Sequence, residues 1–118
     1  MKPPPFDYVQ VKTIDEALSI LNDYGDDAQI IAGGQSIVSM LNMRLIKPKI
    51  IIDINFLKNS SYIISKNKSI FIGPTYRQLD LEKRKKTQYD LPLLSEAISY
   101  VGHMQHRARG TVIGSICH

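Results

Sequence analysis

The segment IIIDI, from Ile50 to Ile54, is the feature of this sequence that most limits the possible folds. It lacks the apolar–polar alternation of a strand with one solvent-exposed face, so it predicts a strand covered on both faces. Such strands lie inside parallel sheets that have helices on both sides. Shorter β-rich segments at 6–11 and 29–32 are the predicted neighbouring strands.

Helical patterns separate these predicted strands. Thr13 and Glu16 have the spacing of a capping box, in which the threonine hydroxyl accepts from the N3 amide and the glutamate from the N-cap amide. Apolar residues at helical spacing follow as far as Gly25, where positive φ is expected, and the same rhythm returns over 36–41. Strand and helix alternation over 6–54 predicts a parallel α/β arrangement.

The second half of the chain has a different pattern. Two β-rich runs separated by KNK within 60–72 predict an antiparallel hairpin that ends at Gly73. A helix is predicted over 75–85, capped by Thr75, and another over 91–104, opened by Pro92. The second helix should turn four apolar side chains inward: Leu94, Ala97, Ile98 and Val101. The predicted class is α+β, an α/β lobe whose small, mostly parallel sheet is flanked by helices and joined by a β-hairpin.

The charge and the apolar content of the sequence limit the classes of ligand and cellular location that can be expected. Fifteen Lys and Arg against eleven Asp and Glu give a net charge of +4, which favours an anionic ligand. The run from Lys83 to Lys86 is typical of a solvated helix end, and a basic nucleic-acid module is the weaker alternative because no aromatic residues interleave. No apolar stretch approaches the ~20 residues of a membrane helix and no signal peptide is recognisable, so a cytoplasmic protein is expected.

Few residues suggest catalysis or metal binding. Cys117 is the only cysteine, so the chain cannot supply the four ligands of an iron–sulfur cluster. His103 and His106 suggest either a metal site or a polar helix end, and no other ligand has suitable spacing. Asp53 suggests either a ribose contact or a turn. No side chain is a convincing acid, base or nucleophile, so no catalytic residue and no metal ligand is predicted.

Two glycine segments are the candidate ligand-binding elements. Gly33 and Gly34 stand where a strand gives way to a helix, which suits either a tight turn or a cradle of backbone amides for a phosphate. The segment from Gly110 to Ser115 again combines glycine, threonine and serine, after two arginines. The motifs of Rossmann folds and of nucleotide hydrolases are both missing. Together the two segments suggest a site in which both bind the same pyrophosphate.

With both glycine segments in place, the sequence resembles the FAD-binding subunit or domain of molybdenum hydroxylases, the group of xanthine dehydrogenase and the carbon monoxide dehydrogenase medium subunit. These have a flavin fold of the p-cresol methylhydroxylase (PCMH) type. The resemblance rests on five segments: FDYVQVKTIDEALSIL, IIAGGQSIVSMLNMRL, IIDIN, IFIGPTYRQL and GHMQHRARGTVIGSICH.

The resemblance implies that residues 1–118 are the N-terminal lobe of a PCMH-type FAD-binding domain. It implies that the first loop wraps the FAD pyrophosphate and that the second completes the site; the residues concerned are Ile31, Ala32, Gly33, Gly34, Gln35 and Ser36, then Gly110, Thr111, Gly114 and Ser115. It further implies electron transfer to FAD from 2Fe–2S clusters on a partner subunit and onward to an acceptor. The molybdenum cofactor would lie on a separate large subunit.

Two departures from the family pattern add expectations. Ile113 stands where the family has a glycine, and a β-branched residue tolerates positive φ poorly, so the second loop should bind more weakly or follow another path. Family members continue through an acidic segment and a second subdomain, so the chain is expected to be a fragment, cut at the second flavin loop, with exposed apolar surface. It would be part of a flavin subunit rather than a complete enzyme. The alternative is a non-catalytic remnant or partner-binding module that holds no flavin alone.

Overall fold

Strand β3 (Ile50–Asp53) is the central strand of a parallel sheet in the computed structural model, which describes residues 1–118. Its neighbours are β1 (Asp7–Gln10) and β2 (Ala28–Ile31), in the order β1-β3-β2. Tyr8 pairs with Ile51 on one side, and Gln29 pairs with Ile51 on the other. All four residues of β3 are buried, which confirms that both faces of this strand are covered.

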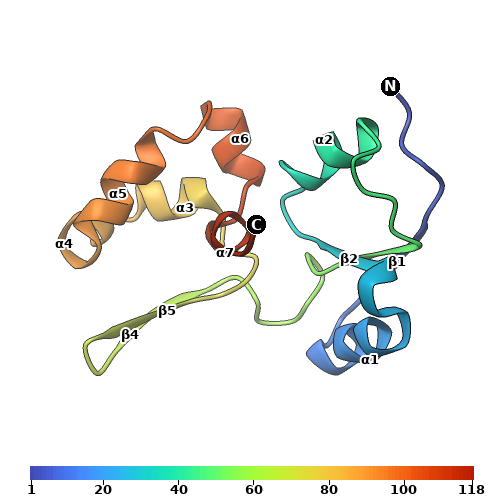
Figure 1. The fold of residues 1–118 in the computed structure, drawn as a ribbon. Coiled ribbons are helices and arrows are strands. Elements are labelled where there is room, and N and C mark those ends of the chain that lie inside the picture. Colours follow the sequence, from blue (N-terminus) through green and yellow to red (C-terminus); the bar gives the residue numbers. More distant parts are fainter. The chain divides into compact units, whose positions relative to one another are not determined.

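Two helices cover opposite faces of this sheet (Figure 1). Helix α1 (Ile14–Tyr24) packs Ala17 against Ile52, whereas α2 (Ile37–Asn42) packs Ile37 and Leu41 against Ile51. Successive residues of a strand face opposite sides, so Ile51 and Ile52 serve separate cores. A short 3-10 helix (Gly25–Asp27) connects α1 to β2.

The start of α1 follows the sequence prediction with one difference. The Thr13 hydroxyl accepts a hydrogen bond from the Glu16 amide at 3.2 Å, as expected for an N-cap. The Glu16 carboxylate, however, accepts from the Lys12 amide at 3.0 Å, one residue before the N-cap. Gly25 has φ +54 at the end of the helix, so the predicted positive φ is confirmed.

The chain forms two units, Met1–Asn59, which contains this sheet, and Ser60–His118. In the second unit, β4 (Ile63–Lys66) and β5 (Ser69–Ile72) form the predicted antiparallel hairpin, with Ile63 opposite Ile72. Five helices follow: α3 (Gln78–Lys83), α4 (Thr87–Asp90), α5 (Pro92–Ser99), α6 (Met104–Arg109) and α7 (Val112–Cys117). The α+β class is confirmed.

The core of the second unit joins helices that are distant in sequence. Leu81 of α3, Ile98 of α5 and Val112 of α7 are buried together. Ile63 and Ile72 of the hairpin pack against them, so one face of the hairpin belongs to this core. None of the helices in the chain has the length and apolar character that a membrane crossing requires.

Several helix predictions for the second unit were wrong in detail. Thr75 does not cap α3; Arg77 is the N-cap residue, and the Thr75 hydroxyl lies 2.7 Å from the Ser60 hydroxyl in a buried pair. The helix predicted over 91–104 ends at Ser99, and α6 begins as a separate helix after Gly102, which has φ +48. Ile98 is buried and Leu94 packs on the core as predicted, but Ala97 and Val101 are exposed.

The basic run lies where α3 ends, as its solvated-helix-end interpretation predicted. Lys83 is the last residue of α3, and Lys85 and Lys86 are exposed before α4. Arg84 differs from its neighbours because its guanidinium lies 3.2 Å from the Asp90 carboxylate. This arginine therefore has a role within the unit, linking the end of α3 to the end of α4.

Candidate functional site

The first glycine loop connects β2 to α2 within the first unit. Ile31 is the last residue of β2, and Ala32 to Ser36 form the connection before α2 begins at Ile37. Ile31 and Ile37 belong to the core around Ile51, so both ends of the loop are anchored. Gln35 and Ser36 are exposed, and the preceding loop residues are half-buried.

Gly34 provides the backbone conformation that the loop needs. Its φ is +74, a value that residues with a side chain rarely adopt, whereas Gly33 has no positive φ. A Cβ at position 34 would also lie 3.3 Å from Val38 Cγ2, tighter than ordinary packing contact. The pair of glycines is therefore not redundant, because Gly34 makes the turn into α2.

The backbone N–H groups of this loop are available to a ligand. The Ile54 amide donates to the Ile31 carbonyl and the Val38 amide donates to the Gly34 carbonyl. Between these two bonds, none of the N–H groups from Ala32 to Ile37 donates a hydrogen bond within the chain. Unsatisfied backbone N–H groups gathered in one turn favour an anion. The residues present therefore fit a phosphate group.

The loop is tied to the end of β3 by side chains. Asn55 donates from Nδ2 to the Ala32 carbonyl at 2.8 Å and to Asp53 Oδ1 at 2.7 Å. The Asn55 amide also donates to Asp53 Oδ1, at 2.9 Å, and the Tyr8 hydroxyl donates to Asp53 Oδ2. The hydrogen bond to Asp53 raises the pKa of Tyr8. Of the two interpretations of Asp53, the structure shows the turn.

The second glycine segment is the start of a helix in the second unit. Gly110 precedes α7, Thr111 is its N-cap, and Gly114 and Ser115 lie inside it. The Thr111 hydroxyl accepts from the Gly114 amide at 3.0 Å, so this amide is occupied. Gly110 and Thr111 are buried, whereas Gly114 and Ser115 are exposed. The fit to a phosphate is therefore less apparent than in the first loop.

Ile113 does not adopt the strained backbone that its position in the family pattern suggested. The residues other than glycine with positive φ are Arg44, Asn59, Asn67 and Lys68. Ile113 lies in α7 with helical backbone, which a β-branched residue adopts readily. Ile113 therefore carries none of the backbone strain from which the two expectations for this segment were drawn.

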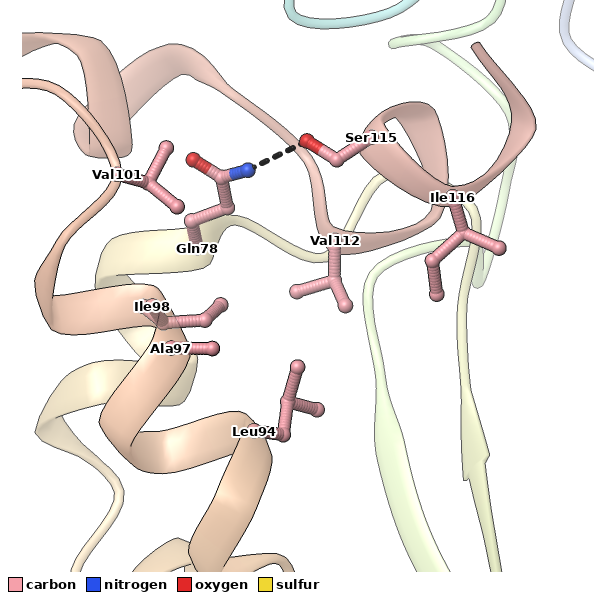
Figure 2. Close-up of a pocket in the computed structure, with 8 residues that line it drawn as sticks. All are labelled: Gln78, Leu94, Ala97, Ile98, Val101, Val112, Ser115 and Ile116. Atoms are coloured by element: carbon pink, nitrogen blue, oxygen red, sulfur yellow. Dashed lines mark hydrogen bonds between the residues drawn. The ribbon is translucent and has the colours of Figure 1, made fainter.

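Gln78 holds the second segment in place from α3. The residue is 3% exposed, and Nε2 donates to the Ser115 hydroxyl at 2.7 Å, while its backbone amide donates to the Gly110 carbonyl at 2.9 Å. Figure 2 shows the hydrogen bond between Gln78 and Ser115 beside a hollow. The volume of this hollow is about 120 Å³. The hollow is otherwise lined by apolar side chains of α5, of α7 and of the segment after α5: Leu94, Ala97, Ile98, Val101, Val112 and Ile116.

The remaining candidates have local roles. The His103 amide donates to His106 Nδ1 at 3.1 Å at the start of α6, as the polar-helix-end interpretation of these residues suggested. Cys117 is exposed at the end of α7. No group of three or more His, Cys, Asp or Glu side chains gathers anywhere in the chain.

Sequence reasoning missed Asn55 and Gln78, the two amide side chains that hold the two segments. A signal existed for Asn55, because polar residues two apart after a buried strand, here Asp53 and Asn55, are typical of a turn built from side-chain hydrogen bonds. Gln78 had no comparable signal. Its partner Ser115 is 37 residues away, and no local pattern indicates such a contact.

Comparisons with known proteins agree with this arrangement. The chain is 45% identical over its whole length to the 6-hydroxypseudooxynicotine dehydrogenase complex subunit alpha of Paenarthrobacter nicotinovorans, of which it covers 40%. It is 36% identical over its whole length to the carbon monoxide dehydrogenase medium chain of Hydrogenophaga pseudoflava, of which it covers 41%. The chain thus spans about two fifths of the length of these relatives.

Solved structures give the same result. The whole chain matches the structure of carbon monoxide dehydrogenase from Hydrogenophaga pseudoflava with a TM-score of 0.94 at 36% identity, covering 41% of that chain. It matches quinoline 2-oxidoreductase from Pseudomonas putida 86 with a TM-score of 0.92 at 30% identity, again covering 41%. The family model described as the FAD binding domain in molybdopterin dehydrogenase matches residues 4–118. This match extends over nearly the whole sequence, and the chain therefore belongs to the family of FAD binding domains in molybdopterin dehydrogenases.

Proposed function

We propose that the first loop, from Ile31 to Ser36, binds the pyrophosphate of FAD in an oxidoreductase of the molybdenum-hydroxylase type. The observation that carries this proposal is the run of N–H groups from Ala32 to Ile37 that donate no hydrogen bond within the chain. Donors fixed in this way can bind a dianionic group without reorganising, and the loop carries no acidic side chain that would repel it. Family membership supports FAD as the molecule that carries the pyrophosphate.

Residues of the second segment are proposed on different grounds. We propose Gly110, Thr111, Gly114 and Ser115 as FAD-binding residues on the family resemblance alone, because much of their own hydrogen bonding is directed within the unit. The Ser115 hydroxyl accepts from Gln78 and keeps its own proton to donate. We expect these residues to contribute less to affinity than the first loop.

The partners are also part of the proposal. The names of the relatives, a complex subunit alpha and a medium chain, describe proteins that belong to assemblies. We propose that this chain likewise works with an iron–sulfur subunit and a large molybdopterin subunit, because its single cysteine cannot ligate a cluster. Bound FAD would supply the electron-transfer chemistry between the clusters and an acceptor. Residues of this chain would bind and orient it.

Flavin retention tests the proposal. The chain, expressed in the full form that its gene encodes, should keep FAD through gel filtration and show flavin absorbance in the protein peak. Gly33→Val should abolish retention, because a β-branched side chain would hinder the close approach of a phosphate to the loop backbone, while far-UV circular dichroism stays near that of the wild type.

Ala108→Val, which introduces the same side chain by adding two methyl groups at an exposed position of α6, is the control and should retain FAD normally. A wild-type protein that does not retain FAD during gel filtration would contradict the proposal and favour the interpretation as a non-catalytic remnant. Unchanged affinity in Gly33→Val would remove the first loop from the site.

A further inference from the structure

We propose that Asn55 is a positioning residue for the flavin loop: held by Asp53, its side-chain amide fixes the Ala32–Gly33 peptide so that the Gly33 N–H faces the bound pyrophosphate. This inference rests on the proposed function of the first loop. It assigns a role in that function to a residue outside the glycine segment, at the end of a different strand.

The contact that carries the inference joins residues 23 positions apart in the chain. Asn55 Nδ2 donates to the Ala32 carbonyl oxygen at 2.8 Å, a normal hydrogen-bond distance. It joins a side chain just after β3 to a carbonyl group of the loop. Ser39 Oγ of α2 also reaches the loop, where it donates to the Gln35 carbonyl at a longer distance of 3.5 Å. The Gln35 side chain also donates to the Gly33 carbonyl, at 3.2 Å, but Gln35 belongs to the loop itself and is exposed.

Because of peptide geometry, this contact also determines the direction of the next backbone N–H, that of Gly33. A peptide unit is planar, and in its trans form the C=O and the following N–H point in opposite directions. The chain has no cis peptide bond, so a carbonyl of Ala32 turned toward Asn55 turns the Gly33 N–H away from it. That N–H is one of those that donate no hydrogen bond within the chain. Asn55 thus orients a free donor without occupying it.

Asp53 orients Asn55 in turn. Asp53 is a buried residue, 7% exposed. Its Oδ1 accepts hydrogen bonds from the backbone nitrogen of Asn55 at 2.9 Å and from the side-chain nitrogen at 2.7 Å. A nitrogen with two acceptors, Asp53 Oδ1 and the Ala32 carbonyl, fixes which end of the amide faces the loop. The Tyr8 hydroxyl donates to the other carboxylate oxygen and so holds Asp53 itself.

An exchange of the two side chains separates positioning from simple stability. Asn55→Asp removes the donor to Ala32 and places two carboxylates together, so both stability and FAD affinity should fall. The double variant Asp53→Asn with Asn55→Asp keeps composition and charge, and restores a hydrogen bond between positions 53 and 55. It leaves a carboxylate, not a donor, beside the Ala32 carbonyl, so the peptide has no anchor.

The measurements are FAD affinity by flavin fluorescence titration and the thermal midpoint without FAD, for the full form that the gene encodes. We expect Asn55→Asp to weaken FAD binding about tenfold or more. The exchange should recover most of the thermal midpoint but not the affinity. In amide NMR spectra, FAD should shift the Gly33 resonance strongly in the wild type and much less in the exchange variant.

Asn67→Asp, the same change in the exposed turn of the β4–β5 hairpin, is the matched control and should alter neither quantity. Recovery of both affinity and midpoint in the exchange variant would overturn the inference, as would wild-type affinity in Asn55→Asp. If Asn55→Asp does not fold, the exchange variant carries the test alone. A wild-type protein that binds no FAD overturns the proposed function and this inference with it, whereas the other contrary results overturn the inference only.

Discussion

At the scale of single residues, Gly34 sets the conformation of the first glycine loop, from Ile31 to Ser36. Gly34→Ala should lower the free energy of unfolding by about 1–3 kcal/mol, because φ +74 is unfavourable for alanine and the new Cβ would press on Val38. It should also weaken FAD binding, since the loop must change shape to relieve the strain. Denaturant unfolding and flavin titration measure the two effects.

Gly25 offers a matched control for this variant. It has φ +54 at the end of α1, and a Cβ there would meet no atom within 4 Å. Gly25→Ala should therefore introduce backbone strain without changing the affinity for FAD. Equal losses of FAD affinity in the two variants would mean that Gly34 acts only through stability.

The Tyr8 hydroxyl gives a pH-dependent prediction at the same scale. Its pKa is raised above 10.0 chiefly by its hydrogen bond to Asp53, so the folded state favours the protonated phenol. A raised folded-state pKa stabilises the protein fully below pH 10, and this stabilisation is lost as pH rises through the folded-state value. Tyr8→Phe should be less stable than the wild type at pH 8, and the difference should shrink above pH 10. A difference in unfolding midpoint that stays constant from pH 8 to 11 would contradict this.

At the scale of elements, the end of the β4–β5 hairpin depends on the absence of a side chain. A Cβ on Gly73 would lie 2.1 Å from the Ser60 carbonyl oxygen and 2.8 Å from Tyr62 Cδ1. The Gly73 amide donates to the Tyr62 carbonyl at 2.8 Å, so the two segments cannot separate without breaking this bond. Gly73→Ala should cost about 3 kcal/mol of unfolding free energy in denaturant titrations.

Ser69→Ala, at the exposed start of β5, is the control for the hairpin and should change the unfolding free energy little. Near-wild-type stability of Gly73→Ala would show that the Ser60 segment moves freely. The two results together distinguish a crowded turn from a general sensitivity of the hairpin to substitution.

Elements differ in how far the sequence alone predicted them. Strand β3 and the start of α1 were predictable because burial on both faces and capping leave local patterns, as the Ile50–Ile54 run and Thr13 illustrate. The break between α5 and α6 was not, because an apolar rhythm continues across Gly102 while the backbone turns with positive φ. The hydrogen bonds of Thr75 and Gln78 involve partners 15 and 37 residues away, which no local pattern encodes.

At the scale of the whole molecule, the division into two units follows the division of the core. Ile52, with no exposed surface, belongs to the core of the first unit, and Leu81, equally buried, belongs to that of the second. The sequence predicted the change of pattern after residue 59, from parallel α/β to hairpin and helices. The family match over 4–118 places both units in one domain family, although their cores are separate.

Separate cores predict that damage to one unit stays local. Ile52→Ala and Leu81→Ala each remove a fully buried aliphatic side chain, which typically costs about 2–5 kcal/mol. Ile52→Ala should speed amide hydrogen exchange in β1, β2, β3 and α1 while amides of α3, α5 and α7 keep wild-type protection, and Leu81→Ala should do the reverse. The two variants are controls for each other because they match in chemistry and burial. If either variant speeds exchange equally in both units, the chain unfolds as one cooperative body, and the first glycine loop would then share the stability of the α3–α7 core rather than that of its own sheet.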